Sequence, residues 1–141
     1  MEKPSAWQLW TLNFELSMAV MSEVEPDVRE LGLEMKELFL LGKLDDHPHP
    51  ADLARALITP KPSITFMVKR LEAAGFVKRQ SEAGDLRRFR LTLTRSGRKV
   101  MESARAILDD AFGRRLMRLS ATERAELART LLRMAAPSAN E

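Results

Sequence analysis

Apolar residues recur every three or four positions near the start of the chain, which is the spacing of one face of a helix. The series consists of Trp7, Trp10, Phe14, Met18 and Met21. Further apolar residues between them widen this surface, so the helix needs cover on more than one side, and a second subunit is one source of it. Ser5 and Gln8 have the spacing of a capping box, and Pro26 interrupts the pattern. We therefore expect a first helix from about Ser5 to about Val24.

Helical spacing, interrupted by turn-forming residues, also divides the rest of the chain. It predicts helices over residues 31–44, 51–57, 63–74 and 98–119, and a last helix after the capping box Ser120–Glu123. Residues 88–94 alternate charged and apolar side chains, which predicts a strand that pairs with another strand at 76–81 across the turn at 82–85. Gly75 stands where a helix commonly ends in a left-handed residue.

This order of elements predicts a mostly α-helical fold with a small β-hairpin. The short helix at 51–57, the turn after it and the helix at 63–74 form a helix-turn-helix, and the hairpin forms its wing. At 141 residues the chain fits a single winged-helix domain, residues 1–141. Residues 31–97 are expected to form the winged helix-turn-helix, flanked by helical regions at 5–25 and 98–136.

Charge is distributed unevenly, although the whole chain has a net charge of only +3. Residues 1–58 carry a net charge of −6, residues 59–99 a net +8 and residues 100–141 a net +1. A cationic segment that coincides with the predicted helix-turn-helix and wing indicates a polyanionic partner. The sequence therefore favours binding of double-stranded DNA by the winged helix-turn-helix.

The helix at 63–74 has the two faces that a recognition helix needs. Its apolar face, with Ile64, Val68 and Leu71, would hold it on the scaffold. Its opposite face and the turn before it carry side chains that reach phosphates and base edges in a major groove. The candidate DNA contacts there are Lys61, Ser63, Thr65, Phe66, Lys69 and Arg70.

The tip of the hairpin supplies the second candidate contact. Arg87 and Arg88 place two guanidinium groups beside a turn, and a narrow minor groove concentrates the negative potential that attracts such groups. Asp85 is expected to pair with Arg87 or a neighbouring cation and so to fix the loop. A cationic hairpin alone is equally well explained as a solvated sheet edge, so it is the adjacency of the two elements that favours DNA binding.

The run from Ala51 to Gly97 resembles the MarR family of bacterial transcription regulators. The motifs that carry the resemblance are Asp52-Leu53-Ala54, Lys61-Pro62-Ser63-Ile64-Thr65, Arg70-Leu71-Glu72, Gly75-Phe76-Val77-Lys78-Arg79, Asp85-Leu86-Arg87 and Leu93-Thr94-Arg95-Ser96-Gly97. The resemblance implies a homodimer, joined by the first helix and the last two, that binds a pseudo-palindromic operator and commonly acts as a repressor. It also implies that Arg87 enters the minor groove, with Asp85 as its salt-bridge partner.

Many members of this family leave DNA when a small aromatic or phenolic ligand binds between the dimerisation and DNA-binding regions. The resemblance therefore implies such a ligand as a partner. Aromatic and polar side chains at helical spacing are candidates for its pocket, although plain core or dimer interface is their commoner role. The candidates are Trp7, Trp10, Asn13, Phe14, Met35 and Phe39.

The sequence offers little for other chemistry. The chain has no cysteine, which excludes disulfides, thiolate zinc sites and cysteine redox switches and fits a cytoplasmic location. His47 and His49 lie in a proline-containing loop that is better explained as solvated than as a metal site. There is no catalytic set, phosphate loop or membrane span, so we expect no enzyme activity, cofactor, metal or membrane partner. The alternative function is a winged-helix module that binds a protein partner without sequence-specific DNA binding.

Overall fold

The computed structural model describes residues 2–82 and 85–137, and the side chains of residues 85–87 also lie outside the description. The described residues form six helices and a two-stranded antiparallel sheet. In chain order they are α1 (Ala6–Glu30), α2 (Met35–Lys43), α3 (Pro50–Ala56), α4 (Lys61–Ala73), β1 (Val77–Glu82), β2 (Asp85–Leu93), α5 (Arg95–Leu116) and α6 (Ala121–Ala135). This confirms the expected mostly helical fold with one hairpin.

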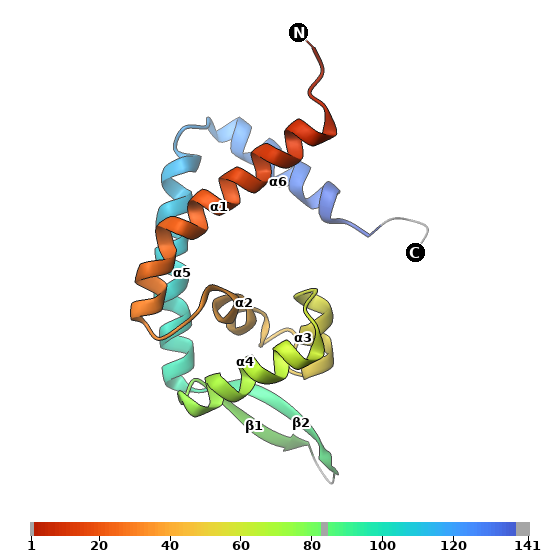
Figure 1. Ribbon diagram of the computed structural model, residues 1–141, viewed down its shortest axis with the longest axis vertical. Coiled ribbons are helices and arrows are strands. Elements are labelled where there is room, and N and C mark those ends of the chain that lie inside the picture. Colours follow the sequence, from red (N-terminus) through yellow and green to blue (C-terminus); the bar gives the residue numbers. More distant parts are fainter. Residues whose placement is uncertain (1, 83–84, 138–141) are drawn as a thin grey trace.

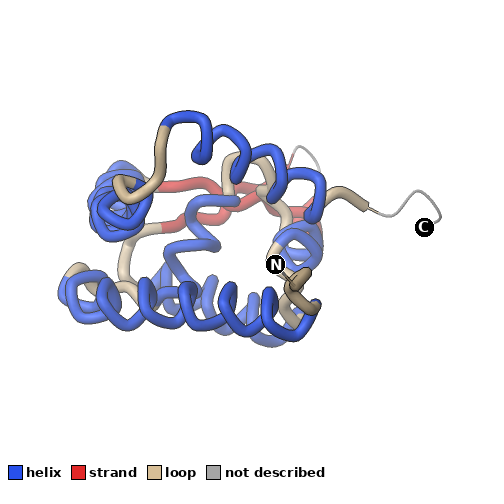
Figure 2. The backbone as a smooth tube through the Cα atoms, turned by 90° about the horizontal axis from the view of Figure 1, so that it is seen from above, coloured by secondary structure: helices blue, strands red, loops and turns tan. Residues whose placement is uncertain are grey.

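The elements form two parts connected by α5. α6 and the N-terminal half of α1 lie at one end of the molecule, and α2, α3, α4 and the hairpin lie at the other (Figure 1). Seen from above, α1 and α6 run along opposite edges, and α5 is viewed nearly end-on at one side (Figure 2). No helix of the described residues is both long and apolar enough to cross a membrane.

The hydrophobic core lies in the part that holds the helix-turn-helix. α2, α3 and α4 each contribute residues that are fully buried, such as Leu41, Leu53 and Ile64. Leu91 of the hairpin and Ala104 of α5 close the same cluster. These apolar positions are the ones that helical and alternating spacing indicate, so burial of their side chains holds the winged helix-turn-helix together.

The prediction that the first helix ends before Pro26 is wrong, because α1 continues through this proline to Glu30. A proline inside a helix lacks an amide hydrogen and costs about 3 kcal/mol or more. Val24 and Val28, on either side of it, are 1% and 0% exposed, and burying each of them contributes about 1.5–3 kcal/mol. Packing of this segment against α5 therefore offsets the effect of the proline.

The predicted start of the second helix at Leu31 is also wrong, since α2 begins at Met35. Gly32 has a φ of +85°, and it ends α1 in the left-handed conformation that favours glycine. The amide of Gly32 donates to the Arg29 carbonyl and that of Leu33 to the Val28 carbonyl, which is the Schellman pattern of a helix end. Residues 31–34 therefore form a tight joint between α1 and α2.

The segment Leu93–Gly97 fixes the start of α5 to the end of α4. The Thr94 hydroxyl accepts from the Gly97 amide and donates to the Gly75 carbonyl over 2.6 Å, and Ser96 donates to the same carbonyl. Gly97 packs so closely on the backbone of Phe76 that a Cβ there would lie 1.9 Å from its carbonyl oxygen. The Leu-Thr-x-x-Gly motif thus joins the base of the wing to the end of α4 and the start of α5.

Candidate nucleic-acid interface

The outward face of α4 carries most of the side chains expected to contact DNA. Lys61, Ser63, Thr65 and Lys69 are exposed, while Ile64, Met67, Val68 and Leu71 on the inner face are buried. Phe66 is also on this face and is 70% exposed. The polar residues face outward because the other apolar positions of the helix, Ile64, Met67, Val68 and Leu71, lie on the opposite face.

Two adjoining hollows run along this face. The first, of about 420 Å³, is lined by Lys61, Pro62, Thr65, Phe66 and Lys69. The second, of about 510 Å³, lies between α3, α4 and the hairpin, and its lining includes Lys61, Thr65 and Arg88. Lys61 and Thr65 line both hollows, so the outward face of α4 and the wing form one continuous surface, on which Lys61, Lys69 and Arg88 are the cations and Glu82 is an anion.

The wing is held against the helix-turn-helix by two contacts with the segment before α3. The Leu91 amide donates to the Pro48 carbonyl over 2.8 Å. His49 Nε2 lies 2.6 Å from Glu82 Oε1, and this hydrogen bond holds the pKa of Glu82 below its ordinary value. The two strands pair from Val77–Leu93 to Glu82–Asp85, with a register shift after Ser81. The wing therefore has a defined direction relative to α4.

The salt bridge expected between Asp85 and Arg87 would join two side chains that lie outside the described residues. The backbones of both residues belong to β2. Arg88, the next residue, is exposed at the edge of the hollow that also holds Lys61.

Arg70 differs from the other expected DNA contacts. Its Nε donates to Glu37 Oε2 over 2.7 Å, and its Nη2 donates to Glu37 Oε1 and to the Gly32 carbonyl. Glu37 is 1% exposed, and this carboxylate raises the pKa of Arg70. The Arg70 side chain is 43% exposed, but its Nε and Nη2 donors are engaged by Glu37 and Gly32, which distinguishes it from Lys61 and Lys69.

Part of the positive charge of residues 59–99 is likewise engaged within the fold. Arg79 pairs with Glu72 over 2.7 Å and stacks on the Phe89 ring, and Arg98 pairs with Asp45 over 3.2 Å. Lys61 and Lys69 have no carboxylate within salt-bridge distance among the described side chains. Charge counting by segment therefore overstates the cations available to a partner.

The six candidate pocket residues do not line one cavity. Trp7, Trp10 and Asn13 line a cavity of about 780 Å³ between α1 and α6, whereas Phe39 lines a different one. Met35 is 8% exposed and belongs to the core, and Phe14 is 53% exposed on α1. The helical spacing placed several of these residues on one face of α1, but it carried no information about which other helix that face meets.

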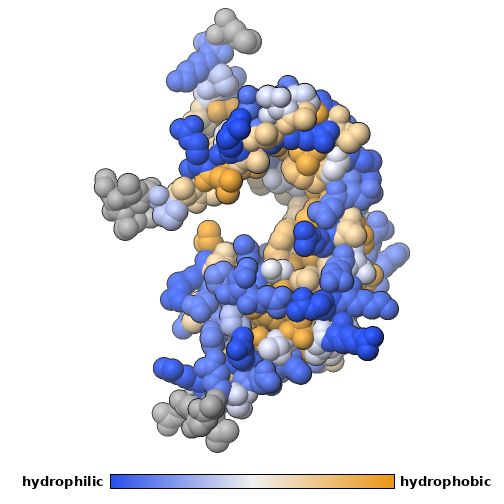
Figure 3. Space-filling model, turned by 180° about the vertical axis from the view of Figure 1, so that it is seen from behind, coloured by the Kyte–Doolittle hydropathy of each residue, from blue (hydrophilic) through white to orange (hydrophobic). Residues whose placement is uncertain are grey.

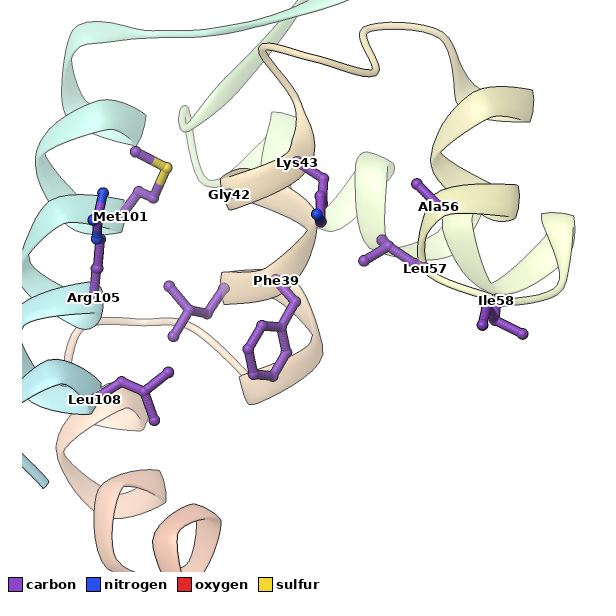
Figure 4. Close-up of a pocket in the computed structure, with 10 residues that line it drawn as sticks. Phe39, Gly42, Lys43, Ala56, Leu57, Ile58, Met101, Arg105 and Leu108 are labelled. Carbon is purple, nitrogen blue, oxygen red and sulfur yellow. The ribbon is translucent and has the colours of Figure 1, made fainter. Parts of the chain in front are cut away.

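The cavity that holds Phe39 has a volume of about 550 Å³ and lies between α2, the end of α3 and α5. Leu57, Met101 and Leu108 contribute apolar surface, and Lys43 and Arg105 contribute positive charge. Figure 4 shows these side chains around one space, with Ile58 at its edge. The space-filling view shows the molecule hollowed between its two parts, with apolar residues on the walls (Figure 3).

The sequence alone does not mark the following residues as functional candidates: Glu37, Lys43, His49 and Arg105. Glu37 stands among the apolar residues of α2, and an acid in such a segment signals a buried partner. Lys43 and Arg105 are ordinary surface cations in the sequence, and only the fold brings them to one cavity. Among the side chains that the structure describes, no three acidic or histidine residues are grouped as a metal-ion site would require.

Comparison with known proteins gives concordant results. A model of the MarR family matches residues 31–88. The HTH-type transcriptional repressor Rv2887 of Mycobacterium tuberculosis is 32% identical over 123 residues, which cover 85% of this chain and 88% of the repressor. The crystal structure of Rv2887 with salicylic acid superimposes with a TM-score of 0.73 at 27% identity, covering 95% of this chain and 98% of that one. The S. aureus MepR–DNA complex has the same fold, with a TM-score of 0.75 at 23% identity over 94% of this chain and 97% of MepR.

Proposed function

This chain belongs to the MarR family, and we propose that it is a cytoplasmic repressor that binds a pseudo-palindromic operator as a homodimer. The observation that carries the proposal is the continuous surface of α4 and the wing, where Lys61, Thr65 and Arg88 lie around one hollow. An exposed helix beside a cationic hairpin fits a major groove and the adjoining minor groove of one duplex.

Within this surface each residue type has a chemical role. Lys61 and Lys69 neutralise phosphates, and the hydroxyls of Ser63 and Thr65 hydrogen-bond phosphates or bases. Phe66 supplies apolar contact for a thymine methyl group. Arg88, with Arg87 as the family resemblance implies, contacts the minor groove. Arg70 is left out of this set because its guanidinium group is bound to Glu37.

The homodimer is supported by the apolar surface of α1 and α6. Trp7, Trp10 and Leu12 of α1 are 74%, 63% and 62% exposed, and Leu132 and Met134 of α6 are 72% and 78% exposed. Monomeric proteins rarely leave so much contiguous apolar surface in water. A second copy that covers this surface through a two-fold axis would also place two α4 helices on one side of the dimer, as a palindromic operator requires.

The ligand that releases the repressor is expected in the cavity that holds Phe39. Its apolar walls with Lys43 and Arg105 at the edge suit an aromatic organic anion. The similar protein Rv2887 has been crystallised with salicylic acid, which is a ligand of this class. The Trp7–Trp10 cavity between α1 and α6 is proposed to belong to the dimer interface instead.

A DNA titration across salt concentrations tests this function. We expect log Kobs for a 30-base-pair duplex (about three helical turns) to fall steeply with log salt concentration. Lys69→Ala should reduce the slope by about 2, since a dimer loses two phosphate contacts worth about 0.9 each. The control Lys3→Ala removes the same charge far from α4 and should leave the slope unchanged. A winged helix that serves a protein partner instead would bind the duplex weakly, with equal slopes for all three proteins.

A further inference from the structure

The side chain of Glu37 connects α2 to α4 and to residues 31–34, the joint between α1 and α2. One oxygen, Oε1, accepts from the Glu34 amide over 2.8 Å at the start of α2, and it also accepts from Arg70 Nη2. The other oxygen, Oε2, accepts from Arg70 Nε over 2.7 Å. Arg70 Nη2 additionally donates to the Gly32 carbonyl over 3.3 Å. A single ion pair therefore links α4 to residues 32–37.

The geometry of this pair requires an arginine. The guanidinium group presents two parallel N–H donors to the two carboxylate oxygens, and a third contact reaches Gly32. A lysine ammonium would keep the charge but is a point donor on a flexible stem, so it does not reproduce the fork. Because the Glu37 side chain is only 2% exposed, solvent cannot substitute for a missing partner.

The position of the pair gives it a role in DNA reading. Residues 31–34 form the joint through which α1 enters the DNA-binding part, and Gly32 there is held in the left-handed conformation. Arg70 attaches the recognition helix directly to that joint, across 38 residues of chain. In a dimer built on α1, this attachment fixes each α4 relative to the two-fold axis and hence relative to the other α4.

We propose that Arg70 and Glu37 are positioning residues that set the placement of the recognition helix for specific operator binding, and that Arg70 is not a phosphate ligand. This inference rests on the proposed function and adds the residues that govern its specificity. Lys69, the neighbour of Arg70 on α4, lines the outer hollow and is the phosphate contact with which it is compared.

The test compares Arg70→Lys, Glu37→Gln and Lys69→Ala on two duplexes, one carrying the operator selected from random DNA and one of unrelated sequence. Affinity for each duplex is measured by fluorescence anisotropy at several salt concentrations. Circular dichroism establishes at each working temperature that the variant is folded. If Arg70→Lys does not fold, Glu37→Gln carries the comparison, since it alters the same pair from the opposite helix.

Arg70→Lys and Glu37→Gln are each expected to lower operator affinity by about tenfold or more, while affinity for the unrelated duplex changes by less than about twofold and the salt slope is unchanged. The result for Glu37→Gln is the more telling, because removing a negative charge should otherwise favour DNA binding. Lys69→Ala should weaken binding to both duplexes and reduce the slope.

Two results would overturn the proposal. An equal loss on both duplexes with a reduced slope for Arg70→Lys would make Arg70 a phosphate contact. A lower melting temperature with an unchanged ratio of operator to unrelated affinity would make the pair a stabilising contact only. Wild-type protein that binds both duplexes equally would contradict the proposed function itself, and this inference with it, before any variant is compared.

Discussion

The winged helix-turn-helix and the terminal helices differ in where their apolar side chains lie. In α2, α3 and α4 most apolar residues face inward, with Phe39 and Phe66 as exceptions, and Leu41, Leu53 and Ile64 are at most 1% exposed. In α6 none of the residues is buried, and α1 buries only Val20, Val24 and Val28 in its C-terminal half. The same helical spacing of apolar residues thus produces a complete core in one region and an open apolar surface in the other.

Apolar periodicity therefore predicts which face of a helix is covered, but it does not predict whether the same chain or a second copy covers that face. In the winged helix-turn-helix, side chains of the same chain cover the apolar faces of the helices. The apolar faces of α6 and of the N-terminal half of α1 would be covered only if a second copy of the chain packed against them.

Trp10→Asp is expected to have the largest effect, because it places a charge on the open surface. In the isolated chain Trp10 is 63% exposed, so the monomer should fold normally. In a two-fold dimer the charge would be buried twice without a partner, which should weaken dimerisation by about 1,000-fold or more. Sedimentation equilibrium measures the change, with Trp10→Phe as the control. An unaltered dimer mass for Trp10→Asp would show that this surface is not the interface.

Leu53→Ala and Leu132→Ala compare the two regions with one chemical change. Leu53 is 0% exposed, so its truncation should lower the free energy of unfolding by about 2–5 kcal/mol at any protein concentration. Leu132 is 72% exposed, so its truncation should cost under about 0.5 kcal/mol in dilute protein and more as concentration favours the dimer. Urea unfolding at two protein concentrations gives both values. Equal, concentration-independent losses would contradict the distinction.

Ile58→Gly is expected to stabilise the protein by about 0.5–1 kcal/mol. Ile58 ends α3 with a φ of +49°, in a Schellman pattern whose equivalents after α1 and α4 use Gly32 and Gly75. A branched side chain is strained there, and Ile58 is 93% exposed, so glycine relieves strain and loses little packing. Thermal unfolding would register the gain. A lower melting temperature would mean that Ile58 is covered in the dimer.

The smallest effect concerns pH and the wing. The hydrogen bond from His49 holds the pKa of Glu82 below its ordinary value of 4.5, so the contact favours the folded state above that pH. This contribution is lost as the pH falls through the lowered pKa of Glu82, where the carboxylate takes up a proton. Glu82→Gln should therefore reduce stability at neutral pH and shift acid unfolding little. An identical difference between the two proteins at pH 7 and pH 3 would contradict this assignment.

The sequence predicts the winged helix-turn-helix well because its patterns are local. Helical spacing, Gly75 and the alternation in β2 each depend on residues within a few positions of one another. The end of α1 is mispredicted because burial of Val28, a tertiary effect, outweighs the proline next to it. A helix boundary predicted from local spacing is therefore wrong where packing against a distant helix determines it.

The candidate interface is predicted less completely than the fold. The exposed residues of α4 follow from its apolar face, so Lys61, Thr65 and Lys69 could be identified from the sequence. The ion pair of Arg70 could not, because its partner Glu37 is 33 positions away on another helix. The cavity proposed for the ligand could not be predicted either, since Phe39 and Arg105 line one space only after α2 packs against α5.

We propose that two copies of this chain present two recognition helices to one duplex. Selection of bound sequences from a random DNA pool tests this directly. We predict an enriched inverted repeat whose half-sites are centred about one helical turn, roughly 10 base pairs, apart or a multiple of it. A pool without enrichment, or one that converges on a single unrepeated half-site bound by one copy, would contradict it.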